Sequence, residues 1–323
     1  MKSLFCIALA AVTLSASVSL SASTGAATSP PRFIYSPYQF LALSDHAKVP
    51  THGALTWAFA TGECGDEIWK DRTGQQVADA NVAAFVAAKR GYLISTGGAD
   101  SAFTCGSDAG MERFIARYAS PQLLGIDFDI EHTQTPAQVD SLIQRARNAQ
   151  KKHPQLRYSF TIATHAASDG SRHSLNPLGE TILAAVKRSG LKGAVYNLMV
   201  MDYGPASAKV CVMGKGSREG VCDMGASALQ AARNAHEKYG IAYSQIALTA
   251  MIGVNDVVTN VFSLDDAATL AAGVKSLELA GLHFWSLDRD QPCAKPTTGA
   301  SDSCSTLDVK AGEFARALGG ALR

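Results

Sequence analysis

Short apolar or β-branched runs alternate with helix-like segments along most of the chain, and this alternation constrains the fold more than any other feature. The eight strand-like runs are residues 32–35, 53–60, 91–95, 123–130, 158–163, 195–201, 246–252 and 282–287. Helical patterns occupy residues 77–90, 137–153, 226–239, 264–280 and 308–322. Eight strand–helix units over roughly 290 residues predict an α/β fold, a single-domain (β/α)8 TIM barrel. An open doubly wound sheet is the alternative that the alternation alone leaves open.

The first 27 residues have the pattern of a secretory signal peptide followed by a short linker. Lys2 supplies a positive charge, residues 4–18 are mostly apolar, and small residues follow at 21–23 and 25–27. This order predicts cleavage near residues 22 to 27, a mature domain at 28–323 and a secreted or periplasmic location. The alternative is an uncleaved anchor helix, but the apolar run is shorter than the ~20 residues that a spanning helix needs.

Six cysteines remain after the predicted leader, which would remove Cys6. An even number in an exported chain favours disulfides over free thiols. Cys211 and Cys222 bracket one short loop, Cys293 and Cys304 bracket another, and Cys64 and Cys105 would then pair by elimination. Six cysteines allow fifteen pairings, so this one is a hypothesis. A zinc site is the rival interpretation, but the spacings do not match a zinc knuckle, and we expect neither a metal nor a cofactor.

Charge argues against polyanionic partners. The chain carries 29 basic and 28 acidic side chains, for a formal net charge of +1, and no basic run or acidic tail is present. We therefore expect no nucleic-acid or membrane partner, and we expect a monomer that acts on a neutral substrate.

The fourth strand-like run carries the strongest chemical signal. Asp127, Asp129 and Glu131 alternate with Ile126, Phe128 and Ile130. Alternate side chains of a strand share one face, so the three carboxyls would point into the barrel and the apolar side chains toward the helices. Crowded like charges raise the pKa of at least one acid, and a general acid must be protonated near neutral pH. An exposed edge strand with a solvated acidic face is the alternative.

This segment resembles glycoside hydrolase family 18, whose fourth-strand motif is Asp-x-x-Asp-x-Asp-x-Glu. Asp127, Asp129 and Glu131 match its last three acids, whereas Leu124 replaces the first. Further resemblances lie at the third, sixth, seventh and eighth strand ends: Ser-Thr-Gly-Gly at 95–98, Asn-Leu-Met-Val-Met-Asp-Tyr at 197–203, Thr-Ala-Met-Ile-Gly-Val-Asn-Asp at 249–256 and Phe-Trp-Ser-Leu-Asp at 284–288. The chain is thus similar to single-domain bacterial chitinases over the whole predicted mature length.

The resemblance implies substrate-assisted, retaining hydrolysis, in which the sugar's own acetamide is the nucleophile. Glu131 would protonate the leaving oxygen and then activate water. Asp129 would orient the acetamido N–H, Asp127 would share a proton with Asp129, and Asp202 would lie near the acetamido group. Trp285 would form the floor under the scissile sugar. Tyr203 is a candidate for the family's sixth-strand tyrosine, which usually stands where this chain has Met201.

Other residues are expected in the cleft because they end strands. These further substrate-binding candidates are Tyr38, Trp57, Gly97, Gly98, Met201, Met251 and Asn255. Gly97 and Gly98 let the backbone approach closely. His132 and His165 also follow strands, and we interpret them as structural histidines, with a place in the site as the alternative.

The expected function is hydrolysis of β-1,4 bonds between N-acetylglucosamine units of chitin or chito-oligosaccharides. An endo-β-N-acetylglucosaminidase that acts on N-glycans would share the fold and the acids. A non-catalytic chitin-binding barrel would share the fold, but such proteins usually lose the acid that Glu131 represents here.

Overall fold

The computed structural model describes residues 1, 33–99, 101–131 and 134–320. The predicted leader and His132 lie outside this described part. Within it, no helix is both long enough and apolar enough to span a membrane.

The described chain folds around one parallel sheet that closes on itself. The strand order is β1-β15-β12-β11-β10-β9-β7-β3-β2. β1 (Ile34–Tyr35) and β2 (Tyr38–Phe40) are two pieces of the first strand, interrupted at Ser36-Pro37. β1 pairs with β15 while β2 pairs with β3, both in parallel, so the first strand joins the two ends of the sheet. The predicted (β/α)8 barrel is therefore confirmed, and the open sheet is excluded.

The other seven barrel strands lie where the apolar runs predicted them, within two residues at most ends. They are β3 (Ala54–Ala60), β7 (Gly91–Gly97), β9 (Leu123–Asp129), β10 (Arg157–Ala163), β11 (Val195–Met199), β12 (Ile246–Met251) and β15 (Gly281–Trp285). Three short two-stranded sheets decorate the loops: β4 (Gly62–Glu63) with β8 (Phe103–Thr104), β5 (Ile68–Trp69) with β6 (Arg72–Thr73), and β13 (Gly253–Val254) with β14 (Val261–Phe262).

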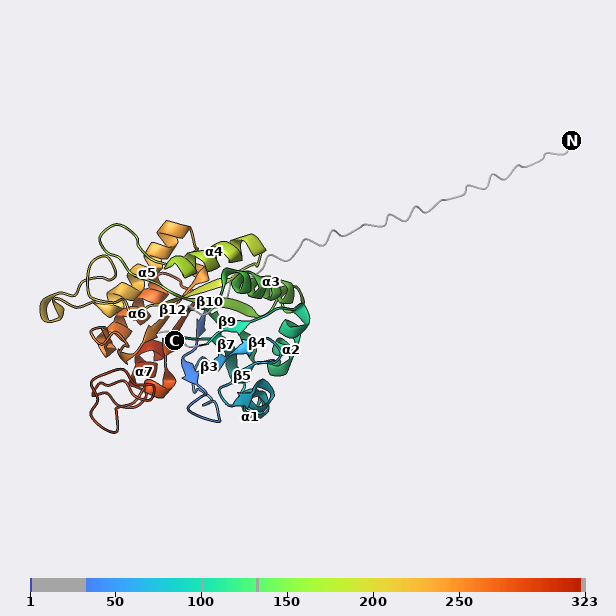
Figure 1. The fold of residues 1–323 in the computed structure, drawn as a ribbon, viewed down its shortest axis with the longest axis horizontal. Coiled ribbons are helices and arrows are strands. Elements are labelled where there is room, and N and C mark those ends of the chain that lie inside the picture. The colour runs from blue at the N-terminus through green and yellow to red at the C-terminus, as the bar shows by residue number, and fades with distance from the viewer. Residues whose placement is uncertain (2–32, 100, 132–133, 321–323) are drawn as a thin grey trace.

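Helices surround the sheet (Figure 1). They are α1 (Gly74–Ala88), α2 (Asp108–Tyr118), α3 (Pro136–Lys152), α4 (Pro177–Ser189), α5 (Met224–Tyr239), α6 (Leu264–Ser276) and α7 (Glu313–Gly320). The sequence patterns predicted five of these helices and missed α2 and α4. Both missed helices begin with readable caps, because Ser107 and Asn176 each accept a hydrogen bond from a backbone N–H of the first turn. The last predicted helix was placed too early, since α7 begins at Glu313 rather than at Asp308.

The hydrophobic core lies between the sheet and the helices, while the barrel interior is largely polar. Outward-facing strand residues such as Ile126, Phe128 and Phe160 are fully buried against the helices. Inward-facing Thr56, Ser95, Ser159, Asn197 and Thr249 are equally buried but occupy the barrel's centre. This division frees the interior for hydrogen-bonded polar groups beneath the carboxyl ends of the strands, where barrel active sites form.

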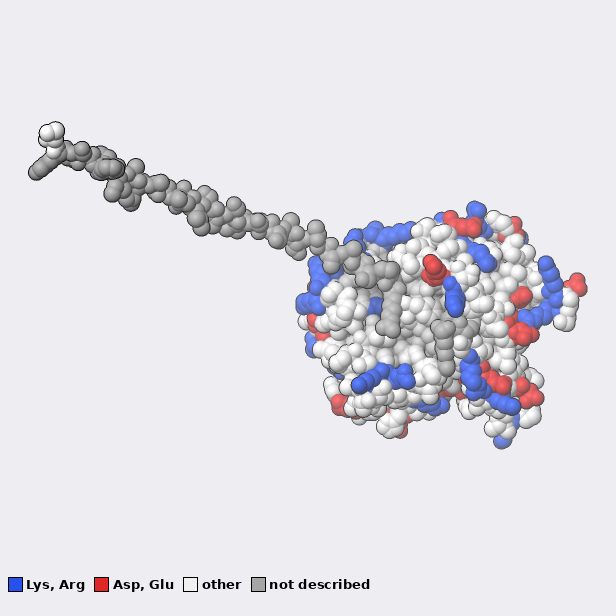
Figure 2. All heavy atoms as spheres, turned by 180° about the vertical axis from the view of Figure 1, so that it is seen from behind, with Lys and Arg blue, Asp and Glu red and all other residues white. Residues whose placement is uncertain are grey.

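Charged side chains are mixed on the surface. On the face shown in Figure 2, Lys and Arg side chains are interspersed with Asp and Glu side chains. This distribution agrees with the near-zero net charge.

Candidate active site

The acidic segment of β9 faces the barrel interior, as its alternation predicted. Asp127 and Asp129 are 2% and 5% exposed on the inner face, and Glu131 follows beyond the strand's end at the mouth. Ile126, Phe128 and Ile130 belong to the core under the helices. Leu124, which replaces the first acid of the family motif, shares that outer face and is half-buried. Its replacement therefore lies on the opposite side of the strand from the three acids.

Asp127 is enclosed by hydroxyl donors. Ser159 Oγ and Thr161 Oγ1 donate to Oδ1 at 2.6 and 2.9 Å. Tyr38 Oη and Ser95 Oγ donate to Oδ2 at 2.9 and 2.7 Å. Burial raises the pKa of Asp127, and the four hydroxyls act in the opposite direction. These contacts hold the carboxyl in one orientation below the cleft.

A second layer fixes those donors. Asn197 Nδ2 donates to Tyr38 Oη at 2.9 Å and to Thr161 Oγ1 at 2.8 Å. Thr249 Oγ1 in turn donates to Asn197 Oδ1 at 2.9 Å. Residues from the first, third, fifth, sixth and seventh strands thus converge around one carboxyl. Tyr38 was predicted from the sequence, whereas no role was predicted for Asn197 or Thr161, although inward-facing polar residues in the middle of apolar strands are a readable signal.

Asp129 has a different environment from Asp127. Its Oδ1 atom is buried, and no described group forms a hydrogen bond with it. Burial, then the charge of Glu131 and then that of Asp127, raise the pKa of Asp129 well above its ordinary value. The hydroxyls that surround Asp127 do not reach Asp129, so its unpartnered oxygen remains available at the base of the cleft.

Gly97 and Gly98 make room for this acid. Both have φ of +89°, and Gly98 N donates to Asp129 O at 3.2 Å. A Cβ at Gly97 would lie 2.1 Å from Asp129 O, and a Cβ at Gly98 would lie 2.9 Å from the Phe59 ring. The close approach predicted for these glycines is therefore made to the protein's own chain, and both residues also line the cleft.

Two further ionisable residues lie inside the barrel. Burial lowers the pKa of His283 to about 4, and His283 Nδ1 lies 2.9 Å from Ser36 O. Burial also lowers the pKa of Arg157 to about 10, while the charge of Asp127 opposes that change. His283 is therefore neutral, and Arg157 is the cation on the inner face of β10.

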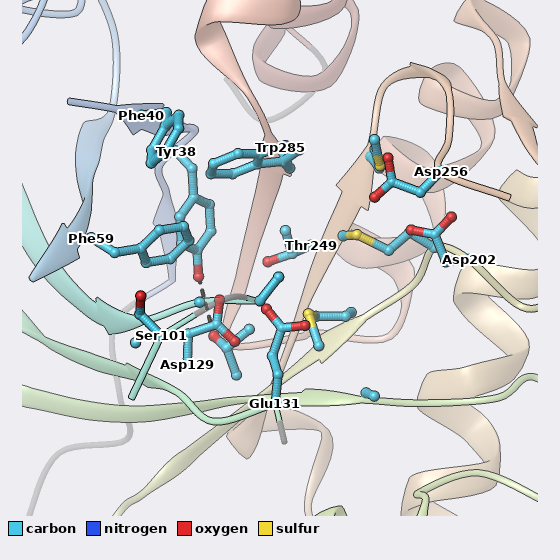
Figure 3. Close-up of a pocket in the computed structure, with 18 of the residues that line it drawn as sticks. Tyr38, Phe40, Phe59, Ser101, Asp129, Glu131, Asp202, Thr249, Asp256 and Trp285 are labelled. Atoms are coloured by element: carbon cyan, nitrogen blue, oxygen red, sulfur yellow. Dashed lines mark hydrogen bonds between the residues drawn. The ribbon is translucent and has the colours of Figure 1, made fainter. Parts of the chain in front are cut away.

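A cleft of about 970 Å³ lies above these acids, at the carboxyl ends of the strands. Figure 3 shows Glu131 and Asp129 between an aromatic group and the paired acids Asp202 and Asp256. The cleft-lining residues that the sequence predicted are Tyr38, Gly97, Gly98, Asp129, Glu131, Met201, Asp202, Met251 and Trp285.

An aromatic wall of Tyr38, Phe40, Phe59 and Trp285 forms one side of the cleft. The Phe59 ring stacks on Trp285, with centroids 5.5 Å apart and planes inclined by 19°. Phe40 and Tyr38 lie 5.6 and 6.3 Å from the Trp285 ring. This apolar surface suits the face of a sugar ring. Phe40 and Phe59 were missed, although Phe40 ends β2 as Trp285 ends β15, and Phe59 is the last residue but one of β3.

Asp202 stands on the other side of the cleft in a left-handed backbone conformation, with φ of +49°. Its Oδ1 accepts a hydrogen bond from Val257 N at 2.7 Å, and its backbone N lies 3.4 Å from Asn255 Oδ1. Burial raises the pKa of Asp202, which the bond from Val257 opposes and the charge of Asp256 reinforces. The loop after β12 therefore sets the orientation of this acid.

Three predicted substrate-binding residues do not reach the cleft. Trp57 faces outward from β3, is fully buried and stacks on Tyr92 with centroids 4.5 Å apart. Tyr203 lies beyond the end of β11 and is buried, and its hydroxyl has no partner among the described residues. Asn255 is buried and donates to Met251 O and Gly253 O, so it supports the cleft's wall from behind. These three assignments were wrong because nearness to a strand's end does not fix the face on which a side chain lies.

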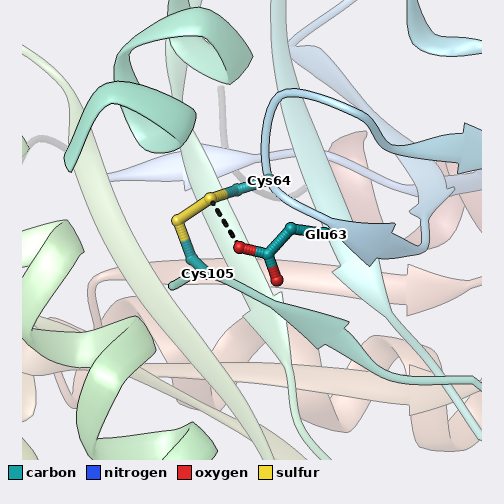
Figure 4. A group of neighbouring side chains, drawn as sticks. All are labelled: Glu63, Cys64 and Cys105. Carbon is teal, nitrogen blue, oxygen red and sulfur yellow. Dashed lines mark hydrogen bonds between the residues drawn. A yellow bond between two sulfur atoms is a disulfide. The ribbon is translucent and has the colours of Figure 1, made fainter. Parts of the chain in front are cut away.

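All three predicted disulfides are present: Cys64–Cys105, Cys211–Cys222 and Cys293–Cys304. Glu63 lies beside the first of them (Figure 4). Its Oε2 accepts from Thr104 Oγ1 at 2.6 Å and its Oε1 from Gly106 N at 2.5 Å. A cysteine binds a metal ion as a thiolate, whereas Cys64 and Cys105 form a disulfide. This group is therefore a structural crosslink.

The site combines a carboxyl group at the mouth of a barrel, a buried neighbouring acid with a raised pKa and an aromatic wall. This is the class of site in which glycosidases protonate a leaving group. No family model matches the sequence. The chain is similar to endochitinase 11 of Metarhizium anisopliae, with 27% identity over 286 residues that cover 82% of this chain and 54% of that protein. It is also similar to a probable bifunctional chitinase/lysozyme of Escherichia coli, with 27% identity over 292 residues that cover 81% and 31% of the two chains. The chain thus spans about half and about a third of the lengths of these two relatives.

Solved structures agree on the fold. Active domain 2 of the thermostable chitinase from Pyrococcus furiosus, solved as catalytic-site mutants with chito-oligosaccharides, superposes with a TM-score of 0.70 at 21% identity. The match covers 92% of this chain and 96% of that one. The fold is that of this chitinase catalytic domain, and the resemblance to chitinases predicted from the sequence is confirmed by the two sequence relatives.

Proposed function

We propose that the protein hydrolyses β-1,4 bonds between N-acetylglucosamine units of chitin or chito-oligosaccharides with retention of configuration. One observation carries the proposal: Glu131 stands at the mouth beside Asp129, whose buried oxygen has no partner among the described residues, opposite the wall formed by Trp285 and Phe59. An acetamide N–H would supply the missing partner of Asp129. The similarity to chitinases, and the chito-oligosaccharides named for the Pyrococcus domain, support the same substrate class.

In the first step, the acetamido carbonyl oxygen forms a bond to the anomeric carbon while the glycosidic bond breaks. Glu131 transfers its proton to the departing oxygen, and an oxazolinium ion remains. Asp129 accepts a hydrogen bond from the acetamido N–H. It also stabilises the positive charge that develops on the sugar, and such electrostatic stabilisation is usually the largest single contribution to catalysis. Asp127, held by its hydroxyl donors, lies behind Asp129 on the same face of β9. Asp202 limits the space on the other side of the reacting sugar.

In the second step, water adds to the anomeric carbon and the bond to the acetamido oxygen breaks. Glu131 takes the proton from this water and returns to its starting form. Because the two displacements occur on opposite faces, the product keeps the β configuration.

Hydrolysis of chitotetraose, followed by chromatography and proton NMR, tests the proposal. We expect a β-anomer in the first products and no cleavage of glucose oligomers, which lack the acetamide. A thiazoline mimic of the intermediate should inhibit. An initial α-anomer would instead mean inversion, and the substrate-assisted scheme would be withdrawn.

Glu131→Gln tests the assignment of the acid. Loss of a general acid lowers turnover by about 10²–10⁴-fold, while the amide keeps the side chain's shape. The variant should therefore fold and bind chitotetraose with little hydrolysis. Binding without hydrolysis by the wild-type protein would favour a chitin-binding barrel over an enzyme.

We also propose that the protein is exported. The support is the pattern of residues 1–27 together with three disulfides, which persist in oxidising compartments.

A further inference from the structure

His165 occupies a position in the cleft that the proposed mechanism leaves unused. Thr161 on β10 is in register with Asp129 on β9, and His165 lies four residues further in the direction of the mouth. Its half-buried side chain lines the cleft, as do those of Asn176 and Met199. The fifth strand stands across the barrel from the first, which carries Tyr38 and Phe40. His165 and the aromatic wall are therefore on opposite sides of Glu131.

The backbone around His165 is held on both sides. His165 N donates to Ser174 O at 2.8 Å, and Ala166 N donates to Val210 O at 2.7 Å. Asn234 Nδ2, from α5, donates to Ala167 O at 2.9 Å, and Ser168 Oγ donates to Cys211 O at 2.9 Å. The backbone of this segment is thus held in one conformation. A side chain on it can bind a ligand without the entropic cost of first ordering the loop.

The ring of His165 is fixed as well. It packs on the ring of His173, with centroids 4.5 Å apart. Burial, and then the charge of His173, lower the pKa of His165, so the ring is neutral at neutral pH. Nδ1 is buried without a partner among the described residues. A buried N–H without an acceptor is costly, so this position favours the tautomer that carries its proton on Nε2.

We propose that His165 binds the sugar on the leaving-group side of the scissile bond, with Nε2–H donating to an oxygen of that sugar. This inference rests on the proposed function and adds which residue recognises the leaving group. The scissile sugar lies against Trp285 with its acetamide toward Asp129. Glu131 contacts the glycosidic oxygen, and the next sugar then extends toward the fifth strand.

Two substrates with different leaving groups test this assignment. Chitotetraose places sugars on both sides of the cleaved bond, whereas 4-nitrophenyl chitobioside places a nitrophenyl group where the leaving sugar would be. His165→Phe keeps a ring against His173 but removes both nitrogen atoms. We expect the ratio of kcat/KM on chitotetraose to kcat/KM on the nitrophenyl substrate to fall roughly tenfold, the loss of about one hydrogen bond. His165→Gln, which retains an N–H donor, should recover part of that ratio.

His52→Ala is the matched control, because His52 is exposed and makes no described hydrogen bond. It should leave the ratio unchanged, and thermal unfolding should show that His165→Phe is folded. An unchanged ratio in His165→Phe, or no recovery in His165→Gln, would overturn the assignment.

The same design separates this inference from the proposed function. If the wild-type protein turns over neither substrate, hydrolysis itself fails. The affinities of Glu131→Gln and of Glu131→Gln/His165→Phe for chitotetraose, measured by calorimetry, then decide the role of His165. Equal dissociation constants would contradict it, and a weakening of roughly tenfold in the double variant would support it.

Discussion

Asp127 and Asp129 lie two residues apart on one face of β9, and burial raises the pKa of both, yet they differ in the hydrogen bonds that they accept. Asp127 receives hydrogen bonds on both oxygens from four hydroxyls. Asp129 has a buried oxygen without a described partner and two acidic neighbours. Both oxygens of Asp127 therefore act as hydrogen-bond acceptors. Asp129, beside two other acids and with an unpartnered oxygen among the described residues, becomes much harder to ionise when the chain folds. Substitution by Asn separates these two situations.

Asp129→Asn should stabilise the protein at neutral pH. Because the folded state raises the pKa of Asp129, its ionisation favours the unfolded chain. The stability of the wild-type protein therefore falls, relative to the variant, as pH rises above about 4, where an unfolded Asp ionises. Thermal unfolding at pH 7 should show a higher Tm for the variant, and at pH 3.5 the difference should be smaller. Asp71→Asn, at an exposed position, is the control; an equal shift at both pH values would contradict the argument.

The turnover number of Asp129→Asn should fall, although its stability should rise. The charge that Asp129 stabilises develops only during the reaction, so Asp129→Asn should lower kcat by about 10²–10³-fold with a smaller change in KM. Steady-state kinetics on chitotetraose measure both constants. A rise in KM with unchanged kcat would place Asp129 in ground-state binding only.

Asp127→Asn should destabilise the protein. An amide NH₂ would meet hydroxyls that now donate to this position, and some of the four would lose their acceptor. Loss of such buried partners costs about 1–3 kcal/mol. Urea unfolding at pH 7 measures the change, and a variant as stable as the wild type would show that the hydroxyls reorient freely.

At the scale of elements, Arg289 connects the end of the seventh strand to the loop after the eighth. Its guanidinium is fully buried and donates to Ile252 O at 2.9 Å, to Val254 O at 2.6 Å and to Ser301 O. The loop that begins at Val254 carries Asn255 and Val257, which orient Asp202. One buried cation thus supports a wall of the cleft through backbone carbonyls.

Arg289→Met should therefore destabilise the protein strongly. Three buried carbonyls would lose a donor, at about 1–3 kcal/mol each. Chemical unfolding should show this loss, whereas Arg113→Met, at an exposed position, should change stability by no more than about 0.5 kcal/mol. A small effect at Arg289 would mean that water replaces the guanidinium.

The sequence predicted elements better than it predicted contacts. Buried strands are continuous apolar runs, so their positions could be read directly. α2 and α4 were missed because each carries a glycine in its first turns, at Gly110 and Gly179, which weakens the helical pattern. Glu131 and Asp129 were predictable because alternation fixes their face. The hydroxyl groups that surround Asp127 could not be predicted, because the closure of the sheet decides which strands bring their side chains to it.

At the scale of the whole molecule, Cys64–Cys105 joins the loops after β3 and β7, whereas Cys211–Cys222 and Cys293–Cys304 each close a single loop. Their pairing was predicted from loop spacing and elimination. Protein recovered after export should have an N-terminus near residues 22 to 27, and peptide mapping without reduction should yield these three pairs. Six free thiols in the exported protein would overturn the compartment argument.

The closure of the barrel through β1 and β15 also sets an order of events during synthesis. Tyr35 pairs with Leu282, so the earliest-made strand must wait for the last-made one. Until then the growing sheet has open edges, whose unpaired N–H and C=O groups can pair with another chain. Such distant pairings also form slowly. The nascent chain is therefore most exposed to aggregation just before its eighth strand emerges, and a holding chaperone would matter most over that interval.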